Sequence, residues 1–375
     1  MTSKEHHKKH GDLTKVISGK FGVNECAIYG TSCDDIAGFV EKVRTFFPDA
    51  DIAFIDADHQ SDGNTFQGTH WQDKMRSVEL NVVIPDNDFQ KRFALKKADL
   101  ILVNGNHFSA SRQIIICNKE KGNSLRKRAE ELTNVVAIIS TESDGSIPDF
   151  VFEILPNAKT ITKVNANDTD ALKNFLTSAF MQPAPLKALI MAGGRSIRMG
   201  KDKTRIVYHS EEQFLHVKHM LDRLGIASFI SCRKDQSEYF VEHECEVIVD
   251  RISDMGPLGG ILSAFMFDPA SAWLVLACDL PLLDSEVINE LIRNRNPFAV
   301  ATSFVSPHDR FPEPLIAIWE PKSYQEALKF IGEGYSCPRK VLINSSAHVI
   351  KSQWPEKLAN VNTIDDIEEV LGHIK

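Results

Sequence analysis

The chain has 375 residues, of which 43% are hydrophobic and 25% charged, and its formal net charge is −8. At about 150 residues per domain, this length suggests two domains. The composition excludes a disordered chain, a collagen and a small disulfide scaffold. No apolar run approaches the ~20 residues of a membrane span, and the charged N-terminus does not resemble a secretory signal. Neither half is basic, so we expect no nucleic-acid partner, and the lack of a long apolar run leads us to expect no membrane partner.

The seven cysteines are scattered along the chain, and no two of them have CxxC spacing. An odd number of isolated cysteines indicates free thiols in a reducing compartment, and it argues against a zinc site or a disulfide framework. We therefore expect a cytoplasmic protein.

The first half shows alternating strand and helix patterns. Apolar residues at helical spacing follow the first predicted strand, and another helix is predicted to begin near Asp168. The predicted strands of this half are 26–30, 52–56, 100–105, 113–117 and 135–140. Two prolines in Met181-Gln-Pro-Ala-Pro185 end the helical pattern and favour an extended connector. This predicts one domain over 1–180, a linker over 181–186 and a second domain over 187–375.

The second half repeats the alternation. Its predicted strands are 186–191, 228–232, 247–250, 273–279, 299–304 and 315–319. Its predicted helices are 213–224, 260–267, 286–293, 324–331 and 364–371. Short apolar strands alternating with amphipathic helices predict an α/β protein with two domains, each a mostly parallel sheet flanked by helices. Such sheets bind ligands at the carboxyl ends of their strands.

A glycine-rich loop follows the predicted strand 186–191 and begins with Gly193 and Gly194. Glycines allow the backbone to approach a ligand closely and to direct N–H groups at phosphate oxygens. Four cations stand in the same loop and could neutralise a triphosphate: Arg195, Arg198, Lys201 and Lys203. The loop is neither a Walker A motif nor GxGxxG, but the density of cations predicts anion binding.

The loop AGGRSIRMGKDK over 192–203 resembles the signature of the nucleotidyltransferases, and most of all that of the molybdenum cofactor guanylyltransferase family. The resemblance continues, in the family's order, through DMGPLGGILS at 254–263, LACDLP at 276–281 and NVNT at 360–363. The cytidylyl-transferring relatives typically carry alanine where Gly193 stands, which favours GTP here. The resemblance implies a Rossmann-like nucleotidyltransferase domain that transfers GMP from GTP to the phosphate of molybdopterin or molybdenum cofactor.

The same resemblance implies which residues contact the nucleotide. Met191, Ala192 and Gly193 would line it with their backbone, and Asp250 would accept hydrogen bonds from the guanine edge or from ribose hydroxyls. Ser231 stands where the family has a nucleotide-contacting asparagine. A serine lacks the paired donor and acceptor of the amide, so base discrimination at this position is open.

The chemistry needs cations and a metal rather than a general base, because a phosphate monoester is mostly a dianion at neutral pH. By resemblance, Asp279 would hold Mg²⁺, which prefers one or two carboxylates together with phosphate oxygens. Arg198 and Lys203 would contact the triphosphate and the leaving pyrophosphate. Asn360 and Asn362 would contact the metal or the pterin substrate, or form an ordinary turn before the last helix.

The first half resembles the P-loop GTP-binding adaptor protein of molybdopterin-guanine dinucleotide biosynthesis. The match is partial, because Ile36 replaces the P-loop lysine and Ala37 the threonine that follows it. Cys33, Asp34 and Asp35 replace the Gly-Ser-Gly run, so carboxylates stand where phosphates would bind. We therefore predict that this half neither hydrolyses nor tightly binds a nucleoside triphosphate, and that Asp34 begins or caps the following helix.

Two alternatives to guanylyl transfer follow from the sequence. A related nucleotidyltransferase would use CTP, or would accept a sugar or alditol phosphate. A scaffold protein would dock molybdoenzymes or pathway proteins through its degenerate first half.

Overall fold

The computed structural model describes residues 13–16, 18–57, 69–74, 77–82, 87–118, 121–193 and 205–361. The chain divides into two compact units, one of Ile17–Gln182 and one of Pro183–Lys375 together with residues before Ile17. The division falls inside the proline-containing segment 181–186. No helix among the described residues is long and apolar enough to cross a membrane.

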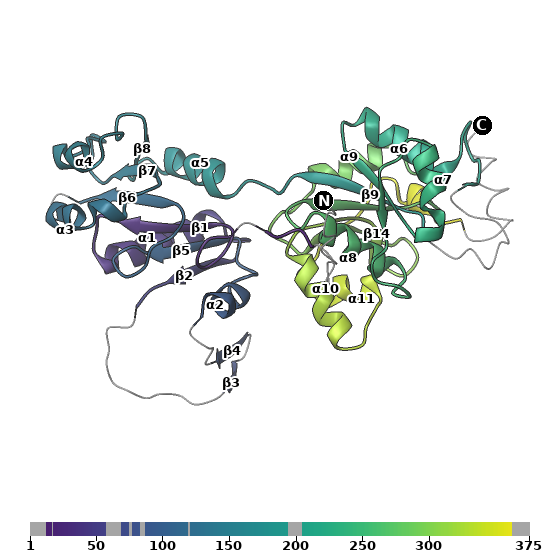
Figure 1. Cartoon of the computed structure of the whole chain (residues 1–375), viewed down its shortest axis with the longest axis horizontal. Helices are drawn as coiled ribbons and strands as arrows, with labels where there is room; N and C mark the ends of the chain where they lie inside the picture. Colours follow the sequence, from purple (N-terminus) through teal and green to yellow (C-terminus); the bar gives the residue numbers. More distant parts are fainter. Residues whose placement is uncertain are drawn as a thin grey trace, which may run out of the picture. The chain divides into compact units, whose positions relative to one another are not determined.

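The first unit contains a six-stranded sheet in the order β2-β5-β1-β6-β7-β8, and every neighbouring pair in it is parallel (Figure 1). Its strands are β1 (Glu25–Tyr29), β2 (Ile52–Ile55), β5 (Leu100–Asn104), β6 (Gln113–Cys117), β7 (Val135–Ser140) and β8 (Thr162–Asn165). Its helices are α1 (Cys33–Phe46), α2 (Asp88–Ala94), α3 (Gly122–Lys127), α4 (Asp149–Ile154) and α5 (Thr169–Phe180). A separate antiparallel pair is formed by β3 (Thr69–Lys74) and β4 (Ser77–Val82).

The central strands of this sheet are buried along their whole length, as parallel strands covered on both faces must be. Helix α1 buries the stripe that its helical spacing predicted, including Ile36, Val40 and Val43. Ser32, and not Asp34, caps this helix, because its side chain accepts a hydrogen bond from the Asp35 N–H at 3.2 Å. Ser32 directly precedes the helix, where a side chain can reach the open N–H groups of the first turn, whereas Asp34 lies exposed within that turn.

The second unit contains a seven-stranded sheet in the order β11-β10-β9-β12-β14-β13-β15. Its strands are β9 (Leu186–Met191), β10 (Ser228–Cys232), β11 (Val247–Val249), β12 (Ala272–Ala277), β13 (Ala301–Val305), β14 (Pro312–Trp319) and β15 (His348–Ile350). Strand β14 is antiparallel to both neighbours, and all other pairs are parallel. The predicted α/β class with mostly parallel sheets is therefore confirmed.

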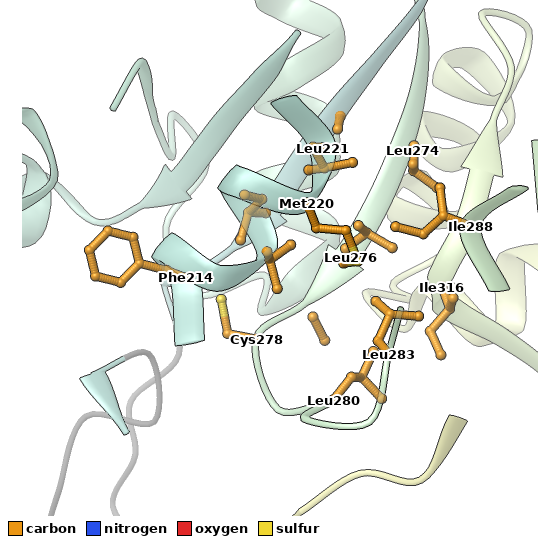
Figure 2. Packing of buried hydrophobic residues seen from close by; sticks show 14 of the residues in the cluster. Phe214, Met220, Leu221, Leu274, Leu276, Cys278, Leu280, Leu283, Ile288 and Ile316 are labelled. Carbon is orange, nitrogen blue, oxygen red and sulfur yellow. The ribbon is translucent and has the colours of Figure 1, made fainter. Parts of the chain in front are cut away.

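Helices cover both faces of this sheet, and alternate residues of each strand face opposite cores. The helices are α6 (Gln213–Arg223), α7 (Ser237–Glu242), α8 (Pro257–Phe267), α9 (Ser285–Arg293), α10 (Ser323–Gly332) and α11 (Pro338–Ile343). Leu274 and Leu276 of β12 pack against Met220 of α6 in one core, whose side chains Figure 2 shows from close by. Their neighbour Val275 packs against α8 in the other core.

Several element boundaries differ from the predicted ones. Helix α8 begins at Pro257, three residues before the predicted start, so Gly259 and Gly260 lie inside the helix. Strand β12 ends at Ala277, so Asp279 stands two residues beyond it. The helix predicted over 364–371 lies outside the described residues.

Candidate nucleotide-binding site

The candidate site lies where four neighbouring parallel strands end, in the order β11, β10, β9 and β12. Strand β9 starts the sheet, the chain then adds β10 and β11 on one side of it, and β12 lies on its other side. The gap between β9 and β12 is thus the topological switch point, where open α/β sheets bind ligands. Met191 is level with Ser231 on one side and with Ala277 on the other. Gly193 and Asp279 each follow their strand by two residues and flank the switch point.

Asp250 is a carboxylate at this edge that hydrogen bonds with β10 hold in place. It directly follows β11, and its N–H donates to the Cys232 carbonyl at 2.9 Å. The Ser231 hydroxyl, itself fully buried, donates to Oδ1 of Asp250 at 2.7 Å. Burial raises the pKa of the Asp250 carboxyl, while the hydrogen bond from Ser231 and the charge of Arg233 act in the opposite direction.

Gly193 packs directly against this carboxylate. A methyl group added at Gly193 would lie 3.0 Å from Oδ2 of Asp250, so any larger residue would press on the carboxylate. Arg233 donates from Nη1 to the Gly193 carbonyl at 3.0 Å and also forms two 3.0 Å hydrogen bonds to Asp235. The guanidinium therefore fastens the start of the glycine-rich loop to the end of β10.

Gly260 of α8 packs closely against Ser231 and Met191. A methyl group at Gly260 would lie 2.3 Å from Oγ of Ser231 and 2.7 Å from Cε of Met191. Helix α8 can approach the strand ends this closely only because the position has no side chain. Gly259 and Gly260 thus serve close packing of α8.

Asp279 is partly exposed, and its Oδ1 atom is buried from solvent. Its backbone carbonyl accepts a hydrogen bond from the Val361 N–H at 2.9 Å, which brings Asn360 to this edge of the sheet. No cluster of three or more His, Cys, Asp or Glu side chains among the described residues could hold a metal ion. One carboxylate fits Mg²⁺ here only if phosphate oxygens and water complete the coordination.

A pocket of about 460 Å³ opens beside Asp279, between the start of α8, the start of β14 and the start of α11. Leu280 and Asn360 line it on the side of the candidate metal ligand. Glu313 and Arg339 line it as well, and they are joined by a hydrogen bond of 2.9 Å. We did not predict these last two residues, because they belong to no motif and meet only where α11 packs against β14.

The structure brings together five of the predicted nucleotide-contacting residues at one place: Met191, Ala192, Gly193, Ser231 and Asp250. It places Asp279 at the adjacent strand end and Asn360 at the pocket. The Ser231 hydroxyl donates to Asp250, so this contact orients the carboxylate. The predicted Arg198, Lys203 and Asn362 lie outside the described residues.

Comparison with known proteins assigns the second unit. The MobA-like NTP transferase domain family matches residues 188–349. A probable molybdenum cofactor guanylyltransferase of Trichormus variabilis is 30% identical over 192 residues, which are 50% of this chain and 91% of that protein. The chain belongs to the molybdenum cofactor guanylyltransferase family. The resemblance of the glycine-rich loop is thereby confirmed, and the second unit carries the family's nucleotidyltransferase domain.

Two further similar proteins also cover about half of the chain. The molybdenum cofactor biosynthesis bifunctional protein of Synechocystis sp. is 31% identical over 192 residues, or 51% of this chain. The chain spans 55% of the length of that relative. The crystal structure of molybdopterin-guanine dinucleotide biosynthesis protein A from Archaeoglobus fulgidus is 22% identical and covers 50% of this chain and 97% of its own, with a TM-score of 0.42.

Proposed function

We propose that the second unit transfers GMP from GTP to the phosphate of molybdopterin or molybdenum cofactor, with release of pyrophosphate and dependence on Mg²⁺. The observation that carries the proposal is the Asp250 carboxylate, which accepts the Ser231 hydroxyl and lies beside Gly193 at the ligand-binding edge. A carboxylate can accept two hydrogen bonds from adjacent donors, and guanine offers such a pair in its N1–H and 2-amino groups. Its alternative partners are the two ribose hydroxyls, which would give no preference among bases.

The transfer is an in-line attack of the acceptor phosphate on the α-phosphorus of GTP. The attacking dianion needs no base, so the task of the protein is to align two polyanions and to stabilise the charge that develops. Arg198 and Lys203 are proposed to contact the triphosphate and the leaving pyrophosphate. Asp279 would hold Mg²⁺, which when bound neutralises phosphate charge.

The pocket beside Asp279 is the proposed site of the acceptor. Its volume of about 460 Å³ falls within the usual range for small-molecule sites. The pocket adjoins Leu280, which follows the proposed metal ligand, so an acceptor lying there would direct its phosphate toward the switch point. Asn360 and Asn362 are proposed to contact this acceptor or the metal.

The deciding experiment supplies the full chain with molybdopterin, Mg²⁺ and either GTP, CTP or ATP, and follows pyrophosphate release. We expect GTP to be the best donor, and Asp279→Ala to abolish turnover. Faster turnover with CTP would overturn the base assignment. A sugar or alditol phosphate that replaced molybdopterin would overturn the acceptor. Turnover retained in the Asp279→Ala variant would remove Asp279 as metal ligand.

We propose further that the first unit binds no nucleoside triphosphate and instead docks pathway proteins or molybdoenzymes. The hydroxyls of Thr31 and Ser32 both donate to Oδ2 of Asp35 at 2.6 Å, so the donors of this loop already hold an anion of the chain itself. The P-loop lysine position holds Ile36, which is fully buried. Calorimetric titration of the full chain with GTP should therefore give one site per chain. A second site that persists in the Asp250→Asn variant would refute this proposal.

A further inference from the structure

A second group of reactive side chains lies in the first unit, at the carboxyl ends of the adjacent strands β2, β5 and β1. Cys33 is the first residue of α1, His107 follows β5 and Asp56 follows β2. The Cys33 sulfur lies 3.4 Å from Nε2 of His107, and this nitrogen lies 3.9 Å from Oδ1 of Asp56. We call these three residues, with Asn106, the thiol cluster. It takes no part in the proposed guanylyl transfer.

The members of the cluster surround the sulfur with a proton acceptor, an N–H donor and a counter-ion for the imidazole. His107 can take up the thiol proton, and Asn106 donates an N–H from Nδ2 to the sulfur at 3.7 Å. Asp56 accepts hydrogen bonds of 2.8 Å from Asn104 and from the Ala57 N–H, which keep it beside the imidazole as a counter-ion. The sulfur also lies at the N-terminus of a 14-residue helix, where the backbone dipole stabilises an anion.

Two carboxylates and one ammonium group of the described residues also lie near the sulfur. Asp34 and Asp35 share its helical turn, and Asp35 is already bonded to the hydroxyls of Thr31 and Ser32. The ammonium group of Lys121, the residue before α3, helps to lower the pKa of Asp35. Asp56 and the Cys33 sulfur both face Nε2 of His107. Asp56 can therefore stabilise an imidazolium, but it does not orient the ring from the opposite nitrogen as the aspartate of a hydrolase triad does.

The remaining cysteines show how unusual Cys33 is within this chain. Five of the seven are buried, and burial raises the pKa of Cys26, Cys117 and Cys232 to about 12. Cys33 is half-buried and Cys337 is exposed, so these two thiols can meet a reagent from solution. Cys337, the exposed thiol directly before α11, therefore serves as a reference within the same chain.

We propose that Cys33 is a modification site, a nucleophilic thiol that exchanges with small disulfides. The proton of the thiol moves to Nε2 of His107, and the thiolate attacks one sulfur of the disulfide. The S–S bond of the disulfide breaks as the new bond to Cys33 forms. The departing thiolate takes the proton from the imidazolium, so one mixed disulfide and one small thiol are produced for each chain.

The test uses the full chain with the neutral reagent 4,4′-dithiodipyridine, whose rate is not affected by nearby carboxylates through charge repulsion. The Cys337→Ser variant reports Cys33, and the Cys33→Ser variant reports Cys337 as matched control. We expect Cys33 to react at least about ten-fold faster near pH 6, where an ordinary thiol is almost fully protonated. Equal rates for the two thiols would overturn the proposal.

Two further variants in the Cys337→Ser background test whether Cys33 reacts quickly because of its neighbours His107 and Asp56, and not only because it is accessible to solvent. His107→Gln keeps an N–H donor but cannot accept the proton, so the rate near pH 6 should fall about ten-fold and the difference should shrink toward pH 9. Asp56→Asn should give a smaller fall with the same pH dependence. Release of one thiopyridone per chain before denaturation shows that each variant is folded. A rate that neither variant changes would refute the role of the cluster.

Discussion

The buried ion pair of Arg295 and Glu320 gives the sharpest prediction about the stability of the second unit. The Glu320 side chain is 1% exposed, and Arg295 binds it through two hydrogen bonds, of 2.6 and 2.9 Å. Arg295 also donates to the carbonyl of Ala184 at 2.8 Å. It therefore connects the segments after α9 and β14 to the residues that enter β9. The Arg295→Met substitution removes all three bonds and keeps most of the side-chain volume.

The cost follows from what the substitution leaves behind. Removing one partner of a buried pair costs about 3–5 kcal/mol, because the remaining carboxylate loses its guanidinium counter-ion. Loss of the hydrogen bond to the Ala184 carbonyl costs about 1 kcal/mol more. We expect the free energy of unfolding to fall by about 5 kcal/mol. The double substitution Arg295→Met and Glu320→Leu should recover most of this loss, since no buried charge remains.

Urea unfolding followed by tryptophan fluorescence measures this loss. Trp273 and Trp319 are fully buried in β12 and β14, the strand that ends beside Glu320, so their emission reports the second unit. The midpoint should shift while the slope with urea stays constant. The exposed Arg293 gives a matched control, and Arg293→Met should stay within about 0.5 kcal/mol of the parent. A loss below about 1 kcal/mol in Arg295→Met, or no recovery in the double variant, would refute the reasoning.

Further predictions concern substitutions of three carboxylates. Asp250→Asn should lower kcat/KM for GTP by about a hundred-fold, or about 3 kcal/mol, in pyrophosphate-release kinetics. Because burial raises the pKa of Asp250, its charged form destabilises the fold, so Asp250→Asn should be more stable than the parent at pH 7 and lose this advantage as the pH falls below the pKa of the folded carboxyl. A less stable variant at pH 7 would contradict this. Glu25 is fully buried and accepts the N–H groups of four residues, so Glu25→Gln should cost about 3 kcal/mol in chemical unfolding of the first unit followed by circular dichroism. An unchanged midpoint would show that these bonds are weak. The hydrogen bonds from Ser32 and Thr31 lower the pKa of Asp35, so its contribution to stability is present above the unfolded pKa and is lost as the pH falls through the folded one. The melting temperature of Asp35→Asn should consequently depend less on pH in the acid range, and an identical acid profile in parent and variant would argue against it.

Much of the site could be predicted from sequence because its residues stand at the ends of buried strands. A parallel strand covered on both faces is a continuous apolar run, so β9, β10, β11 and β12 are visible without a structure. Asp250 and Asp279 follow such runs, and the topology then brings them to one edge. Strands β8 and β15 were missed, because they are short edge strands with polar residues and leave no apolar run.

The sequence by itself determined the α/β class and the family of the second half, and it predicted a division of the chain at the prolines of 181–186. Those properties depend on local patterns, namely burial runs, helical spacing and a contiguous loop motif. Only the tertiary structure showed that Ser231 orients Asp250, that Gly260 is required for packing, and that Glu313 and Arg339 share a pocket. It also brought Cys33, His107 and Asp56 together from three strand ends. Contacts between residues distant in sequence depend on strand order and register, which no local pattern encodes.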